Sequence, residues 1–308
     1  MIVMLWLSFN HPRLPMAKWI RSTDFIDFSV ANGVATVRLN RPERRNALSH
    51  DLLREYRDAL LEADDLRAVS VVVVEGAGTD FCAGYDMKAS YARYASEADA
   101  PEGTYRTGMG SFDDDAWKLE RYAELLRTPF DLHKPVIAKI HGNCVAGGTD
   151  LALYCDLLIA ADDARIGFPA TRAMGSPPNH MWIYHVGPQW AKRLLLTGDV
   201  LLGRDAAKLG LVMQSVPAAE LDAEVARQAG AMASLDPELL ACNKRIVNLA
   251  LEVGGATVMQ RLAAEMDARA HLTRAKRDFD ADVQALGFKG AVRKRDEPFG
   301  TGVARPSW

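Results

Sequence analysis

Apolar positions along the chain follow two alternating patterns. Residues 33–40 (GVATVRLN) alternate apolar and polar side chains, which is typical of a half-buried strand, and residues 50–65 have helical spacing. Residues 68–78 (AVSVVVVEGAG) form a β-branched run, as expected for a strand covered on both faces. Further strands are predicted at 134–142 and 156–163, with a helix between them. This order predicts α/β layering.

The last third of the chain has a different pattern. From about Leu201 the strands are predicted to stop, and amphipathic helices follow over 205–210, 218–233, 236–252 and 258–272. Residues 88–133 have no clean period before a helix predicted at 118–130, and loops this long are usually functional or disordered. We therefore expect three parts: an extension (1–22), a core (23–205) and a helical region (206–308).

Composition narrows the function classes. With 308 residues, 49% of them hydrophobic, the chain can bury a full core. A net charge of only -3 predicts neither nucleic acid nor a membrane surface as a partner. The four cysteines lack paired spacing, which predicts no metal, free thiols and a cytoplasmic location. The opening MIVMLWL is too short for a membrane span and lacks the basic start of a signal peptide.

Two glycine-containing stretches carry the candidate chemistry. In CVAGGTD, Gly147 opens a predicted helix and lets an anionic oxygen approach backbone N–H groups, with Asp150 beside it as an acid or base. In DFCAGYDMK, at the end of a predicted strand, Gly84 allows a similar approach and Tyr85 offers a second N–H. Two such amides aimed at one point would clamp a thioester carbonyl. Alternatively, the glycine pair only permits close packing and Asp150 complements the helix dipole.

Other signatures are incomplete. The segment EGAGTDF lacks the third glycine of a dinucleotide fingerprint, and GDVLLGR lacks the lysine and hydroxyl of a phosphate-binding loop. No GxSxG nucleophile motif is present.

The stretches NRPERRNALS, DFCAGYDMK, KPVIAKIHGNCVAGGTDLALYCDLLIAADDARIGFP and LLTGDVLLGRDAAKLGLV, in this order, resemble the crotonase family of enoyl-CoA hydratases and isomerases. The resemblance implies a spiral of repeated β-β-α units and a C-terminal helical region that forms a homotrimer, often paired into a hexamer. It implies an acyl-CoA substrate and no cofactor, coenzyme A being part of the substrate. By position, it implies catalytic roles for the Tyr85 and Gly147 amides and for Asp150.

The resemblance also implies a path for the adenine and pantetheine of coenzyme A. The substrate-binding residues that it suggests are Arg44, Ala83, Gly84, Asp86, Met87, Lys88, Gly148, Pro169 and Ala170. Arg44, Arg45 and Lys88 are equally consistent with solvated surface cations. The basic run FKGAVRKRDEPF resembles the family's closing helix, which can reach a neighbouring subunit's ligand.

The chain departs from the family pattern at one position. Family hydratases use two carboxylates, and here the first is Asp150 whereas the second position is Ala170. Loss of one carboxylate removes much of an acid–base contribution of about 100- to 10,000-fold. Candidate replacements are Asn179, His180, Tyr85 and Tyr184, although His180 also fits a structural histidine. The acids Asp113, Asp114 and Asp115 are expected to form a solvated face, and the insert after Lys88 is expected to shape specificity.

The sequence therefore predicts an acyl-CoA enzyme of the enoyl-CoA hydratase/isomerase type, a lyase or isomerase that uses one carboxylate. The alternatives are an isomerase, hydrolase or decarboxylase of an unusual acyl-CoA, and a CoA-ester binding protein without turnover.

Overall fold

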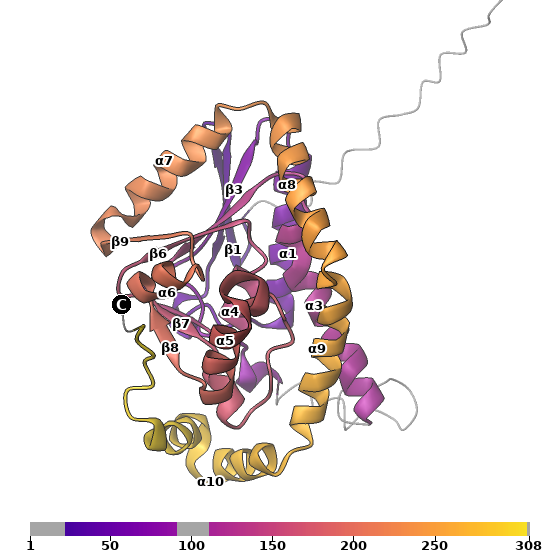
Figure 1. Cartoon of the computed structure of the whole chain (residues 1–308), viewed down its shortest axis with the longest axis vertical. Helices are drawn as coiled ribbons and strands as arrows, with labels where there is room; N and C mark the ends of the chain where they lie inside the picture. Colours follow the sequence, from indigo (N-terminus) through magenta and orange to yellow (C-terminus); the bar gives the residue numbers. More distant parts are fainter. Residues whose placement is uncertain (1–21, 91–110, 307–308) are drawn as a thin grey trace, which may run out of the picture.

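A computed structural model describes residues 22–90 and 111–306 (Figure 1). Its larger sheet has the strand order β1-β2-β3-β4-β6-β9, in which only the β1–β2 pair is antiparallel. Those strands are β1 (Ile26–Ala31), β2 (Val34–Leu39), β3 (Val71–Gly76), β4 (Val136–Ile140), β6 (Leu157–Ala161) and β9 (Gln214–Val216). A smaller sheet contains β5 (Asn143–Val145), β7 (Arg165–Gly167) and β8 (Val200–Leu202), with β5 and β7 parallel.

The chain repeats one structural unit as it advances. After a strand of the larger sheet it enters the second layer as a short extended segment and then turns into a helix, as in β4, β5 and α4 (Gly147–Ala152). Residues that follow β3 join the second layer through a parallel bridge between Cys82 and Cys144, and Leu48 bridges to Tyr85. A unit of two extended segments followed by a helix therefore recurs along the chain.

Helices cover the sheets and form the C-terminal part. They are α1 (His50–Asp65), α3 (Phe112–Asp131), α5 (Trp182–Thr197), α6 (Gly203–Leu209), α7 (Leu221–Ala233), α8 (Pro237–Val253), α9 (Ala256–His271) and α10 (Arg274–Asp296). Short 3₁₀ turns are η1 (Pro42–Arg44), η2 (Pro169–Arg172), η3 (Ala218–Glu220) and η4 (Glu297–Phe299). In Figure 1, α8 and α9 run down one side, α9 lies along α3, and α10 closes the bottom.

The prediction that strands stop near Leu201 is wrong. β9 lies at residues 214–216 and pairs in parallel with β6 at the edge of the larger sheet. A strand of three residues is too short to show a period of two. The division of the chain at residues 205 and 206 stays a prediction.

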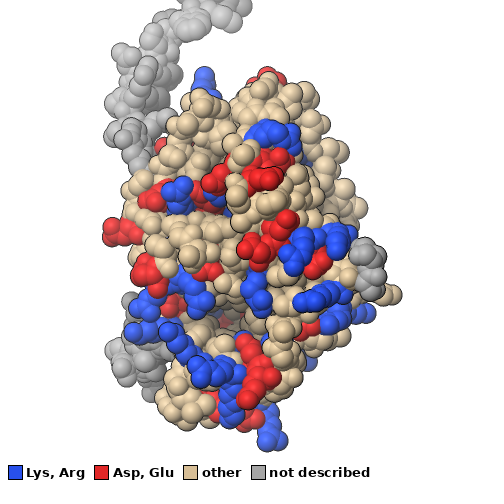
Figure 2. Space-filling model, turned by 90° about the vertical axis from the view of Figure 1, so that its left-hand side faces the viewer, with Lys and Arg blue, Asp and Glu red and all other residues tan. Residues whose placement is uncertain are grey.

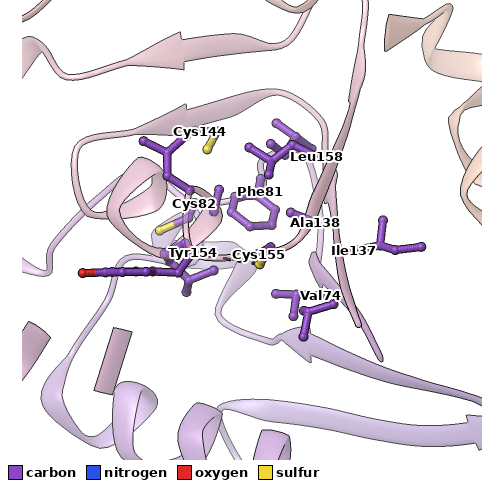
Figure 3. Packing of buried hydrophobic residues seen from close by; sticks show 14 of the residues in the cluster. Val74, Phe81, Cys82, Ile137, Ala138, Cys144, Tyr154, Cys155 and Leu158 are labelled. Atoms are coloured by element: carbon purple, nitrogen blue, oxygen red, sulfur yellow. Dashed lines mark hydrogen bonds between the residues drawn. The ribbon is translucent and has the colours of Figure 1, made fainter. Parts of the chain in front are cut away.

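The core lies between the sheets and the helices. The four valines of β3 are buried, which confirms the prediction of a strand covered on both faces. Next to the turns that follow β3 and β5, the core contains a cluster of buried apolar residues, seen in Figure 3, that includes Phe81, Cys82, Cys144, Tyr154 and Cys155. This packing fixes the position of both turns.

The surface shows no single dominant charge on the face seen in Figure 2, where acidic and basic side chains are interspersed. None of the helices within residues 22–90 and 111–306 has the length and apolar character needed to span a membrane. Residues 1–21 of the expected extension and residues 91–110 of the insert lie outside the described residues.

Candidate functional site

The turn after β3 presents one backbone donor. Leu48 N donates to Gly84 O at 2.8 Å, and Asp86 N donates to Leu48 O at 2.9 Å. Tyr85 lies between Gly84 and Asp86, and its N–H points away from Leu48. This N–H has no acceptor among the described residues. Gly84 has a φ of 100°, which a side chain would strain.

The turn after β5 presents a second donor. Val145 N donates to Cys82 O at 3.1 Å, and Ala146 N donates to Gly167 O at 3.0 Å. Ala146 then has φ 49° and ψ -121°, an unusual conformation for a residue with a side chain that costs about 1 to 3 kcal/mol. The next N–H, that of Gly147, finds no acceptor in residues 22–90 and 111–306.

The two turns are in direct contact. A Cβ atom on Gly84 would lie 3.5 Å from Gly147 N and 3.0 Å from the Cβ of Ala146, and one on Gly147 would lie 3.0 Å from Tyr85 Cε2. A Cβ atom on Gly148 would lie 2.6 Å from Cys82 O. Both glycines are therefore closely packed, and the unused Gly147 N–H lies nearest to the Tyr85 turn.

Asp150 lies in the first turn of α4 and is 0% exposed. The Tyr85 hydroxyl donates to its Oδ2 at 2.8 Å, and its Oδ1 has no partner among the described residues. Burial raises the pKa of Asp150 well above its ordinary value; the Tyr85 hydroxyl opposes this shift and Asp267 adds to it. Burial, followed by the charge of Asp150, likewise raises the pKa of Tyr85. Asp150 is thus a buried carboxyl group and not a surface charge at a helix end.

The turn at residues 41–46 lies beside these donors. Arg41 forms an ion pair with Asp86 at 2.9 Å, and Ala83 N donates to Arg45 O at 2.9 Å. Buried Asn46 donates from Nδ2 to Ala77 O and Asp80 O, both at 2.8 Å. The RPERRNAL turn therefore lies next to residues 83–88, as expected. Asn46 links this turn to the residues that follow β3.

The basic residues predicted to bind coenzyme A lie at the surface. Arg44, Arg45 and Lys88 are exposed, and Met87 is partly buried with its N–H donating to Tyr85 O at 3.0 Å. Their contact with coenzyme A stays a prediction.

The candidate residues between positions 169 and 184 make different contacts. Ala170, after Pro169 in η2, is partly buried, and its carbonyl accepts from Met174 N at 2.8 Å. Asn179 is buried and donates to the backbone oxygen of Asp150 at 2.8 Å, which fixes the end of α4.

The other two proposed substitutes for the missing acid are placed differently. The N–H of His180 donates to Gln260 Oε1 at 2.9 Å, and burial lowers the pKa of its ring. Tyr184 donates its hydroxyl proton to Gly254 O at 3.1 Å, away from the Tyr85–Asp150 pair. Neither side chain is hydrogen-bonded to Asp150.

A second group of ionisable side chains lies between α3, α9 and the segment before α5. Asp267 of α9 accepts from Ser176 N at 2.9 Å and lies 3.6 Å from His271 Nε2, while His271 Nδ1 contacts Asp115 Oδ2 at 2.7 Å. Burial raises the pKa of Asp267 to about 7, against the effects of His271 and the Ser176 N–H. We call Asp115, His271 and Asp267 the α9 cluster.

The sequence patterns did not predict the α9 cluster. The prediction that Asp115 belongs to a solvated face is wrong. Asp115 lies in the first turn of α3, and its side chain packs against His271 of α9. One signal was available: Gln260, Asp267 and His271 recur at helical spacing with the small buried residues of α9, so they interrupt an otherwise apolar face.

In the part of the chain that the structure describes, neither the cysteines nor the potential metal ligands form a further candidate site. All four cysteines lie in the described part and are unpaired, and burial raises the pKa of Cys82 to about 12, so it stays a thiol. Within the described ranges, no group of three His, Cys, Asp or Glu side chains has an arrangement that could hold a metal ion.

Comparisons with known proteins identify the family to which the chain is similar. Residues 29–285 match the family model described as enoyl-CoA hydratase/isomerase. A hydroxycinnamoyl-CoA hydratase-lyase from Pseudomonas fluorescens is 36% identical over 64% of this chain and 68% of its own length. A crotonyl-CoA hydratase from Syntrophomonas wolfei is 34% identical, over 65% and 72% respectively.

Solved structures extend the similarity to the fold. An enoyl-CoA hydratase from Mycobacterium smegmatis superimposes with a TM-score of 0.81 at 34% identity, covering 90% of this chain and 94% of the other. An enoyl-CoA hydratase/isomerase from Xanthobacter autotrophicus Py2 also has a TM-score of 0.81, at 32% identity, with coverage of 90% and 99%. The spiral of β-β-α units with its C-terminal helices is confirmed.

Proposed function

Because the chain belongs to the enoyl-CoA hydratase/isomerase family, the crotonase family, we propose that it stabilises the enolate of an acyl-CoA thioester through the Tyr85 and Gly147 amides. Asp150 moves the proton at the α-carbon. The observation that carries this proposal is the pair of adjoining backbone N–H groups that lack acceptors within residues 22–90 and 111–306, next to a buried carboxyl group.

The chemistry follows from where charge develops. When the α-proton leaves, or a nucleophile adds at the β-carbon, negative charge grows on the thioester oxygen. Two fixed N–H dipoles stabilise this charge, each by about 3 to 4 kcal/mol in sites of this kind. The raised pKa of Asp150 makes its carboxylate a stronger base and lets its carboxyl form return the proton.

The family supports a lyase or an isomerase reaction. Isomerisation moves one proton and needs one carboxyl group, whereas water addition needs a second group that activates the water. Ala170 at the usual second position favours isomerisation unless another element of the chain supplies that group. The relatives' names include a hydroxycinnamoyl-CoA and a crotonyl-CoA activity, so both aromatic and aliphatic acyl groups are candidates.

Two measurements test the proposal. Incubating saturated acyl-CoA esters in heavy water is expected to exchange their α-protons, as followed by mass spectrometry. A panel of aromatic and aliphatic enoyl-CoA and 3-hydroxyacyl-CoA esters then separates hydration from isomerisation, hydrolysis and decarboxylation. Binding of every ester without exchange or conversion would instead identify a CoA-ester binding protein.

We also propose that the chain acts as a homotrimer, able to pair into a hexamer. Supporting residues are exposed apolar side chains of the C-terminal helices, namely Ile246, Val247, Leu249, Val253, Val258, Leu262, Met266, Leu286 and Phe288. A mass measured in solution by light scattering tests this assembly, and a monomer at micromolar concentration would contradict it. The cytoplasmic location stays a prediction.

A further inference from the structure

We propose that Asp267 of α9 is the second carboxyl group of the acyl site and activates the water that adds to the β-carbon. This inference rests on the proposed function. It places the group that Ala170 does not supply on a helix of the C-terminal region.

The segment at residues 175–181 connects Asp267 to Asp150. Asn179 donates to the backbone oxygen of Asp150, and three residues earlier Ser176 N donates to Asp267 Oδ1. Gly175 allows this approach, because a Cβ atom there would lie 2.3 Å from Asp267 Oδ1. The Asp267 carboxyl group and the backbone of Asp150 therefore both bind the short segment at residues 176–179.

The charge of Asp267 also acts on the Tyr85–Asp150 pair. The charge of Asp267 contributes to the raised pKa of both Asp150 and Tyr85. Two carboxyl groups that interact in a dry site do not both ionise readily, so one holds a proton while the other accepts one. Addition of water to an enoyl-CoA requires one carboxyl group in each state.

Unsatisfied polar atoms independently indicate a ligand. Gln260, two turns before Asp267 on α9, is 6% exposed, and its Nε2 has no partner among the described residues. Asp150 Oδ1 is buried and similarly lacks a partner there. Buried polar atoms are normally hydrogen-bonded, so a polar group such as water or an acyl substituent would satisfy each of these two atoms.

The remaining members of the α9 cluster are positioning residues. His271 contacts Asp267 through Nε2 and Asp115 of α3 through Nδ1, so the imidazole lies between the two carboxyl groups and orients that of Asp267. Burial alone would lower the pKa of His271, but Asp115 and Asp267 raise it, which favours a cation beside Asp267. Asp115 is therefore expected to act only through His271.

The proposed step is balanced. As the water oxygen bonds to the β-carbon, a water proton passes to the Asp267 carboxylate, and the π electrons of the α,β double bond move into the thioester as an enolate. The enolate then takes a proton at the α-carbon from the Asp150 carboxyl group. The product is a 3-hydroxyacyl-CoA, and exchange with solvent returns the proton from Asp267 to Asp150.

The test separates water activation from enolate formation. In Asp267→Asn, hydration of an enoyl-CoA is expected to fall by about 100-fold or more, while α-proton exchange of a saturated acyl-CoA stays within about 3-fold of the unaltered protein, because Asp150 and the two amides are retained. Asp278→Asn, on the exposed surface of α10, is the matched control and should leave both rates unchanged.

Each other outcome has a defined meaning. Unchanged hydration in Asp267→Asn would overturn the inference, and so would loss of both reactions, which would make Asp267 a support for the whole site. Exchange without hydration in the unaltered protein would also overturn it and leave the proposed function standing. Absence of exchange in the unaltered protein would instead remove the proposed function.

Discussion

The Tyr85–Asp150 pair and the α9 cluster both contain a buried carboxyl group with a raised pKa, but different parts of the fold position them. Backbone hydrogen bonds between the turns after β3 and β5 fix the first pair. Packing of α3 against α9 fixes the second, in which His271 and Asp115 are 156 residues apart in sequence. Backbone pairing tolerates the substitution of side chains, whereas helix packing depends on the side chains themselves. The two regions are therefore expected to respond differently to substitution.

The largest effect is expected for Asp150→Asn. Removing the carboxyl group leaves the two amides in place but eliminates the proton acceptor, so α-proton exchange should fall by about 1,000-fold. Affinity for the acyl-CoA should change little, because in the proposed site Asp150 contacts only the α-carbon and not coenzyme A. Exchange is measured by mass spectrometry and affinity by calorimetry. An exchange rate equal to that of the unaltered protein would remove Asp150 from the mechanism.

Gly148→Ala tests how strictly backbone packing positions the first pair. The added methyl group would lie 2.6 Å from Cys82 O, so α4 must shift away from the turn after β3. The free energy of unfolding should fall by about 1 to 3 kcal/mol, as measured by urea denaturation.

A matched control for this change is Gly230→Ala in α7, where nothing lies within 4 Å of the added atom. Alanine in a helix should leave stability unchanged or raise it by about 1 kcal/mol. Equal losses for both variants would show that Gly148 is not packed as tightly as described.

Tyr85→Phe separates the side chain of Tyr85 from its amide. The variant keeps the N–H donor but removes the hydroxyl that stabilises the charged form of Asp150, so the pKa of Asp150 should rise further. Exchange near neutral pH should fall by about 10-fold, as expected for loss of a hydrogen bond to a charged group. The pH profile of exchange should move to higher pH.

Tyr184→Phe removes a hydroxyl that is bonded only to Gly254 O among the described residues, and it should leave the profile unchanged. A profile for Tyr85→Phe that coincides with this control would show that the phenol does not influence Asp150.

The smallest effect is expected for His271→Gln, which sharpens the role of the α9 cluster. The groups that face Asp267 are His271, Asp115, Asp150 and the Ser176 N–H. A base is active above its pKa, so hydration should rise with pH around the Asp267 pKa of about 7. Because His271 lowers that pKa, the midpoint should move to higher pH in the variant while the plateau rate changes little.

Exchange of α-protons serves as the internal reference for His271→Gln, since it depends on Asp150. A midpoint that moves to lower pH, or stays in place, would contradict the described contact between His271 and Asp267.

Sequence patterns predicted the parts of the molecule that are locally encoded. The periods of β2, β3, β4, β6, α1, α7, α8 and α9 are long enough to be recognised, whereas β5, β7 and β9 have three residues each. Tyr85, Gly147 and Asp150 could be proposed from the sequence because each lies in a contiguous motif at the end of a strand. Asp267 lies between Glu265 and Arg269 on an amphipathic helix, where an acid is usually exposed, and only the packing of α9 on α3 shows that it is buried.

Ala146 determines how the two turns meet. A glycine would adopt its backbone angles more easily, but the Ala146 methyl group fills the space directly above Gly84. The separation between the two amide donors is therefore set by backbone hydrogen bonds between the turns and by close packing of buried atoms, and neither is an ion pair that dissolved salt screens. We expect the spacing of these donors to be nearly independent of ionic strength, even where surface ion pairs elsewhere on the protein dissociate.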